Sequence, residues 1–282
     1  MSLCLMAVHA HPDDEVLGTG GVLARYAAEG VRTVLVTCTD GAVGEIVRPG
    51  IATPETLARV REGELRAACT ILGVRELHLL GYRDSGMVGT EPNNHPDSFH
   101  QSDLDAATGR LVGLVRRTRP QVMVTYTEDG GYGHPDHIRA HQIAVAAFEA
   151  AGDPARYPEQ ALEPWAPSKL YYSVWTRSDF KRLLDGLKEA GLPPPWDIEA
   201  ESPDEPGAPD EMATARVDVR TYALVKQRAL GAHRTQIEED SVFLRMPAQL
   251  QREVGGHETF FLAQSRVPTS EHEDDLFAGL RD

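Results

Sequence analysis

Side chains that can bind a metal and move protons are concentrated near the start of the chain. His9, His11, Asp13, Asp14 and Glu15 lie within seven residues, at the end of an apolar run. Imidazole nitrogens and carboxylate oxygens are ligands of zinc, and a carboxylate next to a ligand in the sequence can act as a general base. The alternative is a structural role, in which the carboxylates cap a helix and form its acidic first turn. Because capping does not account for the histidines, the segment predicts a catalytic metal site.

A second cluster repeats the His-Pro-Asp order later in the chain. His134, Asp136 and His137 follow another apolar run, and Tyr132 stands two residues before them. A catalytic zinc uses three protein ligands and keeps one position open for a reactant. Parallel strands in an open sheet bring their carboxyl ends to one edge, where such sites are found. We therefore expect the two clusters, about 120 residues apart, to converge on one ion.

The elements that must position these clusters alternate between strands and helices. The run Val34-Leu35-Val36 has the continuous apolar character of a strand buried in a parallel sheet. The βαβα order predicts an α/β fold: a Rossmann-like, mostly parallel sheet flanked by helices, with right-handed crossovers. We expect strands at residues 3–9, 32–39, 76–80, 121–126 and 169–174, and helices at 16–29, 54–72, 104–119 and 135–151.

The last third of the chain is less regular and predicts C-terminal elaborations of this core. We expect helices at 178–191, 221–233 and, in part, 239–254, with strands at 215–219 and 258–263. Three prolines at 193–195 and an acidic stretch at 199–211 predict a surface loop. We find no repeat and no linker composition. We therefore expect a single domain over residues 1–282, with the Rossmann-like core at 1–176 and the elaboration at 177–282.

The composition is that of a globular protein and excludes several classes of partner. The 282 residues include 28 Lys and Arg and 43 Asp and Glu, which gives a net charge of −15, and the basic residues form no stripe. We therefore expect no binding to nucleic acid or to an anionic membrane. No apolar run approaches the roughly 20 residues of a membrane helix, and the N-terminus lacks the layout of a signal peptide. Three cysteines in apolar segments indicate buried thiols and a cytoplasmic protein.

Together, the two clusters resemble the zinc-dependent N-deacetylases of the PIG-L or LmbE-like family. Within it, the closest resemblance is to the mycothiol-pathway pair, a deacetylase of an N-acetylglucosaminyl-inositol and an amidase of mycothiol conjugates. The similarity covers most of the chain and weakens between residues 178 and 213. It is carried by His11-Pro12-Asp13-Asp14-Glu15 and Gly133-His134-Pro135-Asp136-His137, and by shorter segments at 37–41, 44–45, 61–65, 83–87, 125–126 and 232–236.

The resemblance implies a metal site and a base. By it, His11, Asp14 and His137 bind Zn2+, with Fe2+ as the alternative metal in the cell, and Asp13 is the general base that takes a proton from the attacking water. Zinc is a Lewis acid and lowers the pKa of bound water to about 7. His141, four residues after His137, is a rival ligand on the same helix face, but we expect it to pack or to cap.

The resemblance also implies roles around the reacting carbonyl. By it, His134 is protonated and stabilises the oxyanion or protonates the leaving amine, Asp136 holds the His134 ring, and Tyr132 helps to polarise the amide carbonyl. A positive charge beside a developing oxyanion stabilises it. We expect His9 to be a hydrogen-bonded core histidine, and His233 to reach the rim of the site.

Substrate contacts are implied at three further residues. Arg61, Asp84 and Glu45 match positions that hold the sugar and its neighbour in the mycothiol-type enzymes. The alternatives are surface charge for Arg61 and a turn or cap for Asp84. The loop at residues 40–43 is less acidic than that of these relatives, which bears on specificity near Glu45.

The resemblance predicts a zinc-dependent amide hydrolase that removes an N-acetyl group from an N-acetylglucosamine conjugate, of the mycothiol- or bacillithiol-biosynthesis type. One alternative is a mycothiol S-conjugate amidase acting on a larger acyl chain. An alternative of another class is a dinucleotide-binding module, because Gly18-Thr19-Gly20-Gly21 follows the first strand. These glycines come late, however, and the preceding carboxylates would repel a pyrophosphate. The expected partner is a small glucosamine conjugate, and self-association into a homo-oligomer is compatible with the sequence.

Overall fold

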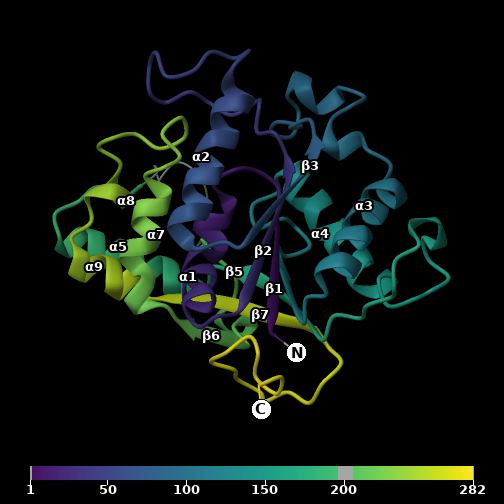
Figure 1. Cartoon of the computed structure of the whole chain (residues 1–282). Helices are drawn as coiled ribbons and strands as arrows, with labels where there is room; N and C mark the ends of the chain where they lie inside the picture. Colours follow the sequence, from purple (N-terminus) through teal and green to yellow (C-terminus); the bar gives the residue numbers. More distant parts are fainter. Residues whose placement is uncertain (1, 196–205, 282) are drawn as a thin grey trace.

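The computed structural model describes residues 2–195 and 206–281, in which seven strands form one sheet. The strands are β1 (Cys4–His9), β2 (Arg32–Thr39), β3 (Glu76–Tyr82), β4 (Val122–Thr125), β5 (Lys169–Val174), β6 (Ala215–Asp218) and β7 (His257–Ser265). Their order across the sheet is β3-β2-β1-β4-β5-β7-β6 (Figure 1). The first five are paired in parallel, whereas β7 is antiparallel to β5 and to β6.

Helices cover both faces of the sheet. The longer ones are α1 (Asp14–Ala28), α2 (Leu57–Leu72), α3 (Leu104–Thr118), α4 (Pro135–Ala150), α5 (Arg177–Glu189) and α7 (Ala223–Leu230), followed by the short α8 (Val242–Arg245) and α9 (Ala248–Val254). Figure 1 shows α2 and α7 on one side of the strands and α3 and α4 on the other. Each face has its own hydrophobic core, one built with α3 and α4 and the other with α1, α2 and α7.

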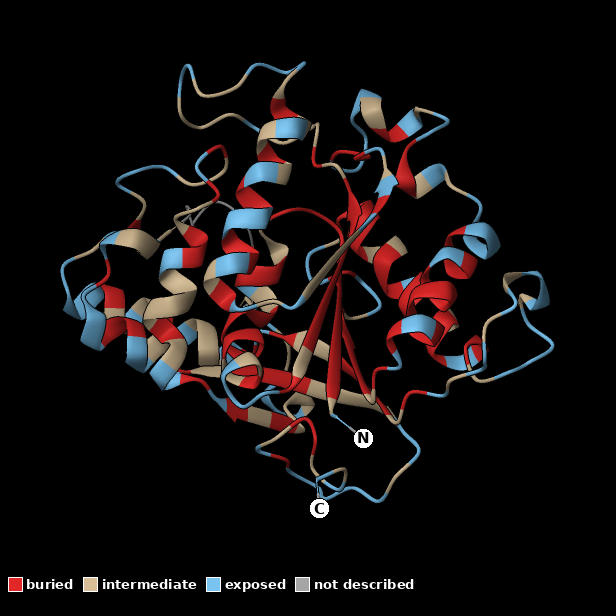
Figure 2. Ribbon diagram, viewed as in Figure 1, coloured by how far each residue is buried: buried red, intermediate tan, exposed pale blue. Residues whose placement is uncertain are grey.

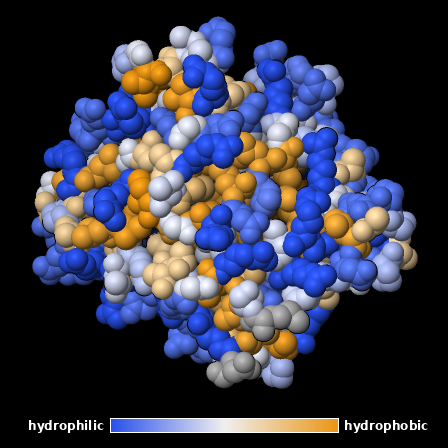
Figure 3. Space-filling view, in the orientation of Figure 1, coloured by the Kyte–Doolittle hydropathy of each residue, from blue (hydrophilic) through white to orange (hydrophobic). Residues whose placement is uncertain are grey.

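The predicted fold class is confirmed, and its reason is visible in the central strands. Val34, Leu35 and Val36 are fully buried, as expected of a parallel strand covered by helices on both faces. Figure 2 shows the central strands almost entirely buried, and α2 banded with buried and exposed turns. The amphipathic helices therefore turn their apolar sides to the sheet. On the face seen in Figure 3, hydrophobic residues gather across the middle, with hydrophilic residues among and around them.

Two expected helices differ in their bounds from those observed. The helix expected at 221–233 is the shorter α7, Ala223–Leu230. The helix expected from residue 54 begins at Leu57, after a turn that Thr53 and Thr56 form with each other. Residues 239–254, expected to be helical in part, form α8 and α9, which are divided at Pro247. Proline has no amide hydrogen to donate and it disfavours the helical conformation in the residue before it, so one continuous helix cannot pass through this position. Part of the predicted surface loop at 199–211 lies outside the described residues.

The cysteines and the lengths of the helices bear on two further predictions. Cys4, Cys38 and Cys69 are buried and free, as predicted. Over residues 2–195 and 206–281, every helix is too short or too polar to cross a bilayer.

Candidate active site

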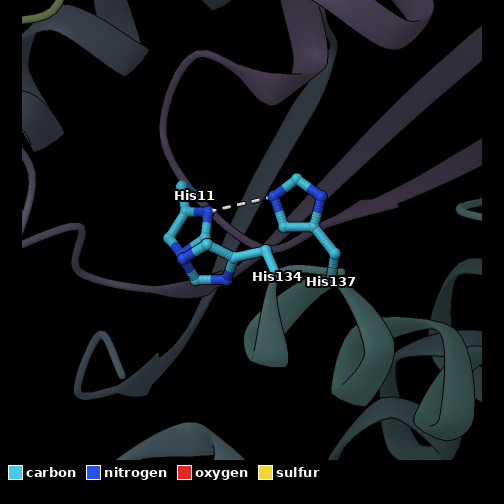
Figure 4. A group of neighbouring side chains, drawn as sticks. All are labelled: His11, His134 and His137. Carbon is cyan, nitrogen blue, oxygen red and sulfur yellow. Dashed lines mark hydrogen bonds between the residues drawn. The ribbon is translucent and has the colours of Figure 1, made fainter. Parts of the chain in front are cut away.

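The two polar clusters converge at the carboxyl edge of the sheet. His11 follows β1, and Asp14 begins α1 immediately after it. His134 is the N-cap of α4, which follows β4, the neighbour of β1 in the sheet. Figure 4 shows the rings of His11, His134 and His137 gathered at one point, with His134 and His137 at the start of α4. The predicted convergence is thus present in the structure.

Three atoms of this cluster have the spacing of metal ligands. Nδ1 of His11 lies 3.3 Å from Oδ2 of Asp14, and Nε2 of His137 lies 3.4 Å from that oxygen. The two nitrogens are 3.3 Å apart. Zinc ligands at about 2.0–2.1 Å in a tetrahedral arrangement are separated by about 3.3–3.4 Å. The residues predicted to bind zinc therefore fit such an ion.

Two other groups of residues also bring ligand atoms within 4.8 Å of one another: His11 with His134 and His137, and His11 with Asp84 and Asp136. We favour the group containing Asp14, because its carboxylate oxygen lies 3.3 and 3.4 Å from nitrogens of both histidines. Burial alone would raise the pKa of Asp14, but His137 and His11 hold it well below its usual value. Asp14 is therefore a carboxylate at neutral pH.

Neighbouring groups orient both histidine rings toward Asp14. Nε2 of His11 lies 3.2 Å from Oδ2 of Asp136, and Nδ1 of His137 lies 3.0 Å from the carbonyl oxygen of Gly130. A proton on each of these nitrogens leaves the other nitrogen free to bind a metal. Gly130 has φ +71°, and a Cβ there would lie 2.7 Å from Cβ of His137, so only glycine permits this contact.

The carboxylate of Asp136 has different partners from those predicted. It is fully buried and accepts hydrogen bonds from the backbone amide of Ser85 at 2.9 Å, from the Ser85 hydroxyl and from His11. The expected hold on the His134 ring comes instead from the backbone amide of Asp136, which donates to Nδ1 of His134 at 3.1 Å. Asp136 thus orients a proposed metal ligand.

Replacing Asp136 by alanine is expected to weaken metal binding by about 10- to 100-fold, because a residue that orients a metal-bound histidine contributes that much. The measurement is the metal dissociation constant from competition with a chelator. Ser85→Ala, which removes only the hydroxyl bound to Asp136, is the milder comparison. Equal metal affinity in wild type and Asp136→Ala would contradict this role.

Asp13 stands beside the proposed ligands in a strained backbone conformation. Its φ of 108° and ψ of −30° are rare for a residue other than glycine. Nη2 of Arg61 donates to Oδ2 of Asp13 at 3.1 Å. Burial raises the pKa of Asp13 to about 6, although Arg61 acts in the opposite direction. A carboxyl group with a pKa near the working pH is suited to general base catalysis.

The raised pKa of Asp13 predicts how activity depends on pH. A base must be unprotonated to act, so kcat/KM is expected to rise with pH and to pass its half-maximum near pH 6. The measurement is a pH profile of kcat/KM. A profile that is flat between about pH 5 and pH 7 would contradict the assignment of this base.

The surroundings of His134 disfavour the protonated ring that the resemblance implies. Its Nδ1 accepts the hydrogen bond from the backbone amide of Asp136, so that nitrogen carries no proton. Burial, followed by the charges of His11 and His137, lowers the pKa of His134 to about 4. A neutral ring with an acceptor at Nδ1 carries its proton on Nε2 and can donate one hydrogen bond.

Two predicted contacts of the substrate lie at the surface. Tyr132 is 64% exposed, and its ring meets the ring of His137 edge-on, with 4.9 Å between the centroids. Glu45 is exposed, and its backbone carbonyl accepts a hydrogen bond from the side chain of Gln236 at 2.8 Å. Both residues can therefore be reached by a molecule from solvent.

Arg61 and Asp84 are placed differently from the predicted substrate contacts. Arg61 is 3% exposed, which also excludes the surface alternative, and it donates to the carbonyl oxygens of Gly41 at 2.8 Å and Pro12 at 2.5 Å. Asp84 is also buried and accepts from the amides of Val43 and Gly86 at 3.1 and 2.8 Å, which confirms its turn alternative. Both residues hold the loops that form the site.

Tyr126 is a site residue for which no role was predicted from the sequence. Its hydroxyl donates to Oδ2 of Asp14 at 2.7 Å and accepts from the amide of Ala10 at 2.7 Å. Its ring stacks on His137 with 4.2 Å between the centroids. His9 lies behind it and bonds to Thr19 at 2.8 Å, as expected of a core histidine. Tyr126 could have been found in the sequence, because it stands at the end of an apolar strand beside a predicted site.

His233 and His141 are both buried. His233, predicted at the rim, is fully buried, with Nε2 2.7 Å from Oε1 of Glu15. The prediction for its position was therefore wrong. His141 lies 2.9 Å from the backbone oxygen of Tyr126 and packs edge-on against Tyr172, which confirms its packing role.

The glycines that suggested a dinucleotide site have another partner. The amides of Gly21 and Val22 donate to the two oxygens of the Glu258 carboxylate, each at 2.7 Å. A Cβ at position 21 would lie 2.6 Å from Val219. A carboxylate of the chain itself thus occupies the amides that a phosphate would need, so the structure does not support this alternative.

Solved structures with the same fold include enzymes of different activity. The N,N'-diacetylchitobiose deacetylase of Pyrococcus horikoshii has a TM-score of 0.64 at 18% identity, over 92% of this chain and 83% of that one. The 4-carboxy-2-hydroxymuconate hydratase of Pseudomonas putida has a TM-score of 0.60 at 20% identity, over 96% and 99% of the two chains. These similarities establish the fold alone, and the reaction must be argued from the site.

Sequence comparison is more specific. Residues 6–148 match the family described as PIG-L, GlcNAc-PI de-N-acetylase. The 1D-myo-inositol 2-acetamido-2-deoxy-alpha-D-glucopyranoside deacetylase of Geodermatophilus obscurus is 44% identical over 98% of this chain and 97% of its own. The enzyme of that name from Thermobispora bispora is 42% identical, over 98% of each chain. These matches confirm the resemblance, and the chain belongs to the PIG-L family.

Proposed function

We propose that this protein is a metal-dependent amide hydrolase that removes the acetyl group from the 2-amino group of a glucosamine linked to inositol. The observation that carries the proposal is the arrangement of His11, Asp14 and His137, whose ligand atoms are 3.3 to 3.4 Å apart. Asp13 lies directly beside these residues in the sequence. The substrate is inferred from relatives that match nearly the whole chain and that are named for the deacetylation of such a glycoside.

The proposed ion is Zn2+, with Fe2+ as the alternative, held by the two imidazoles and the carboxylate. A bound zinc ion would polarise the amide carbonyl and make water a better nucleophile at neutral pH. Two nitrogen ligands and one oxygen ligand match the donors of catalytic zinc sites. His11 is oriented by Asp136, and His137 by the carbonyl of Gly130, so the ligands are prepared for an ion.

Asp13 has two tasks in the proposed reaction. Its carboxylate takes a proton from the attacking water as the oxygen forms a bond to the acetyl carbon. The protonated Asp13 then gives that proton to the amine nitrogen as the C–N bond breaks. Acetic acid, which loses its remaining proton to water and becomes acetate, and the free amine leave. A pKa near 6 suits both steps, because the group can be either the acid or the base near neutral pH.

His134 and Tyr132 are placed to interact with the substrate around the reacting carbonyl. The Nε2–H of neutral His134 can donate to the oxyanion, and a positioned donor of this kind needs no positive charge. An imidazole kept neutral at a helix N-terminus serves as such a donor in other enzymes. Tyr132, which is exposed beside His137, is positioned to donate a hydrogen bond from its hydroxyl to the carbonyl oxygen or to cover the sugar. Glu45 can accept hydrogen bonds from substrate hydroxyls.

We also propose that residues 1–282 form one cytoplasmic domain whose partner is this small molecule. Two observations support the single domain. The sheet continues from the core into β6 and β7, and Glu258 of β7 binds the backbone of α1.

The test is hydrolysis of three substrates with and without a chelator: the N-acetylglucosaminyl-inositol, free N-acetylglucosamine and a mycothiol S-conjugate. The inositol glycoside is expected to give the highest kcat/KM, and activity should disappear with chelator and return with Zn2+. Preference for the S-conjugate would favour the amidase alternative. Activity that resists the chelator, in protein without metal, would contradict the proposal.

A further inference from the structure

A buried pair of side chains connects the C-terminal part of the chain to Asp13. Nε2 of His233 lies 2.7 Å from Oε1 of Glu15, and both residues are fully buried. The other oxygen of Glu15 accepts the backbone amide of Asp13 at 2.9 Å. His233 follows α7, outside residues 6–148 that match the family. Through Glu15, it therefore reaches the backbone of the proposed base.

The backbone of Asp13 needs such support because of its conformation. A residue other than glycine in a sparsely populated backbone conformation is destabilising and persists only where its surroundings impose it. Arg61 restrains Asp13 from one side, through its carboxylate and through the carbonyl of Pro12. Glu15 restrains it from the other side, through its amide. Removal of the second restraint would free the φ of Asp13 to relax.

Stability alone does not account for His233. Within residues 2–195 and 206–281, its buried Nδ1 has no hydrogen-bond partner, and an unsatisfied buried polar group is destabilising. A buried ionic pair is also weak evidence for stabilisation, since apolar replacements are often as stable. The position of His233 is better explained by its contact with Glu15.

The segment that carries His233 has its own anchor. The amide and the hydroxyl of Thr235 donate to the two oxygens of Glu64, at 2.8 and 2.6 Å. The backbone oxygen of His233 accepts from Gln236 and Ile237. A change of the side chain at position 233 therefore leaves these contacts of the segment in place.

We infer that His233 is a positioning residue: by holding the Glu15 carboxylate, it keeps the backbone of Asp13 in the conformation that aims its side chain at the reacting water. The inference rests on the proposed function, in which Asp13 is the base. It assigns a role in the reaction to the C-terminal elaboration, which supplies none of the proposed ligands.

The experiment compares His233→Leu, which has no hydrogen-bond donor, with His233→Gln, whose amide can still donate to Glu15. His233→Leu is expected to lower kcat by about 10- to 100-fold, because a displacement of about 1 Å can cost that much. KM and bound metal should stay close to wild type, and His233→Gln should recover part of kcat. Thr235→Val, which loses a bond to Glu64 without touching Glu15, is the matched control and should keep kcat.

Three results would overturn the inference: wild-type kcat in His233→Leu, a loss of kcat that parallels a loss of metal, or an equal loss in Thr235→Val. If His233→Leu does not fold, His233→Asn replaces it, since its shorter amide does not reach Glu15; equal kcat in the Asn and Gln variants would then contradict the inference. A crystal structure of the variant decides independently of activity. Asp13 with φ still near 108° overturns the inference, whereas an inactive wild type overturns only the proposed function.

Discussion

Replacing Asp13 by asparagine is expected to lower kcat by about 10²- to 10⁴-fold, the usual contribution of a general base. The amide has nearly the same shape, and asparagine tolerates positive φ better than most residues, so the loop should keep its conformation. Metal content should equal that of the wild type, because the three atoms that are spaced as metal ligands belong to other residues. The measurement is kcat together with the metal stoichiometry of the purified protein.

The control is Asp97→Asn, the same chemical change at an exposed carboxylate, which should leave kcat unchanged. Loss of metal in Asp13→Asn would mean that Asp13 and Asp14 exchange the roles proposed for them. Wild-type kcat in the variant would remove Asp13 from the reaction.

The same substitution is expected to stabilise the metal-free protein at neutral pH. Burial raises the pKa of Asp13 from 3.8 to about 6, so the folded state holds this proton more tightly than the unfolded chain. The free energy of unfolding therefore falls as pH rises between these two values and stays lower above them. Asparagine carries no charge and avoids this loss. Denaturant unfolding of the two proteins at pH 7 measures the effect, and a less stable variant would contradict it.

Replacing Asp14 by alanine is expected to abolish metal binding and, with it, activity. Oδ2 of Asp14 is the atom that both His11 and His137 face, and it contributes the only negative charge of the three proposed ligands. Loss of a ligand should weaken binding by more than the about 100-fold that an orienting neighbour can contribute. Metal analysis after dialysis, and competition with a chelator, provide the measurement.

Tyr126→Phe is the matched comparison for Asp14→Ala, because it removes only the hydroxyl that donates to Oδ2. That variant should retain metal with lower affinity. A full complement of metal in Asp14→Ala would show that the ion is held elsewhere, with His134 or Asp84 as the remaining candidates beside His11.

The convergence of the two clusters could be predicted because it depends on few rules. Apolar runs identified the strands, parallel strands place their ends at one edge, and β1 and β4 proved to be neighbours. Element boundaries were less certain. Pro247 marks the division within the region 239–254, which was expected to be helical in part, whereas the start of α2 at Leu57 depends on a local turn.

The direction in which each polar side chain forms its hydrogen bonds could not be predicted. Asp136 lies two residues from His134, yet its carboxylate binds His11 and Ser85, because the turn of α4 aims it there. From the sequence, Arg61 was expected either to contact the substrate or to lie at the surface, but the fold buries it against the loop before α1. Such outcomes depend on tertiary contacts that no local pattern contains.

Glu15 and His233 are the clearest case of this limit. They are 218 residues apart, and no spacing rule connects a carboxylate at the start of a helix with an imidazole after another helix. A buried pair of this kind becomes visible only when both residues are placed in space. The sequence showed only that Glu15 stands next to the metal cluster.

Glu258 of β7, which binds the backbone of α1, limits how far the protein can be shortened. An excised fragment of residues 1–176 would retain every proposed ligand and the base. It would still lack Glu258, whose oxygens accept hydrogen bonds from the amides of Gly21 and Val22. It would also lack His233, whose imidazole contacts Glu15. A shorter active fragment must therefore still contain Glu258 and His233, which contact α1 from distant parts of the chain. For the same reason, grafting the two His-Pro-Asp motifs onto another scaffold would not transfer the activity.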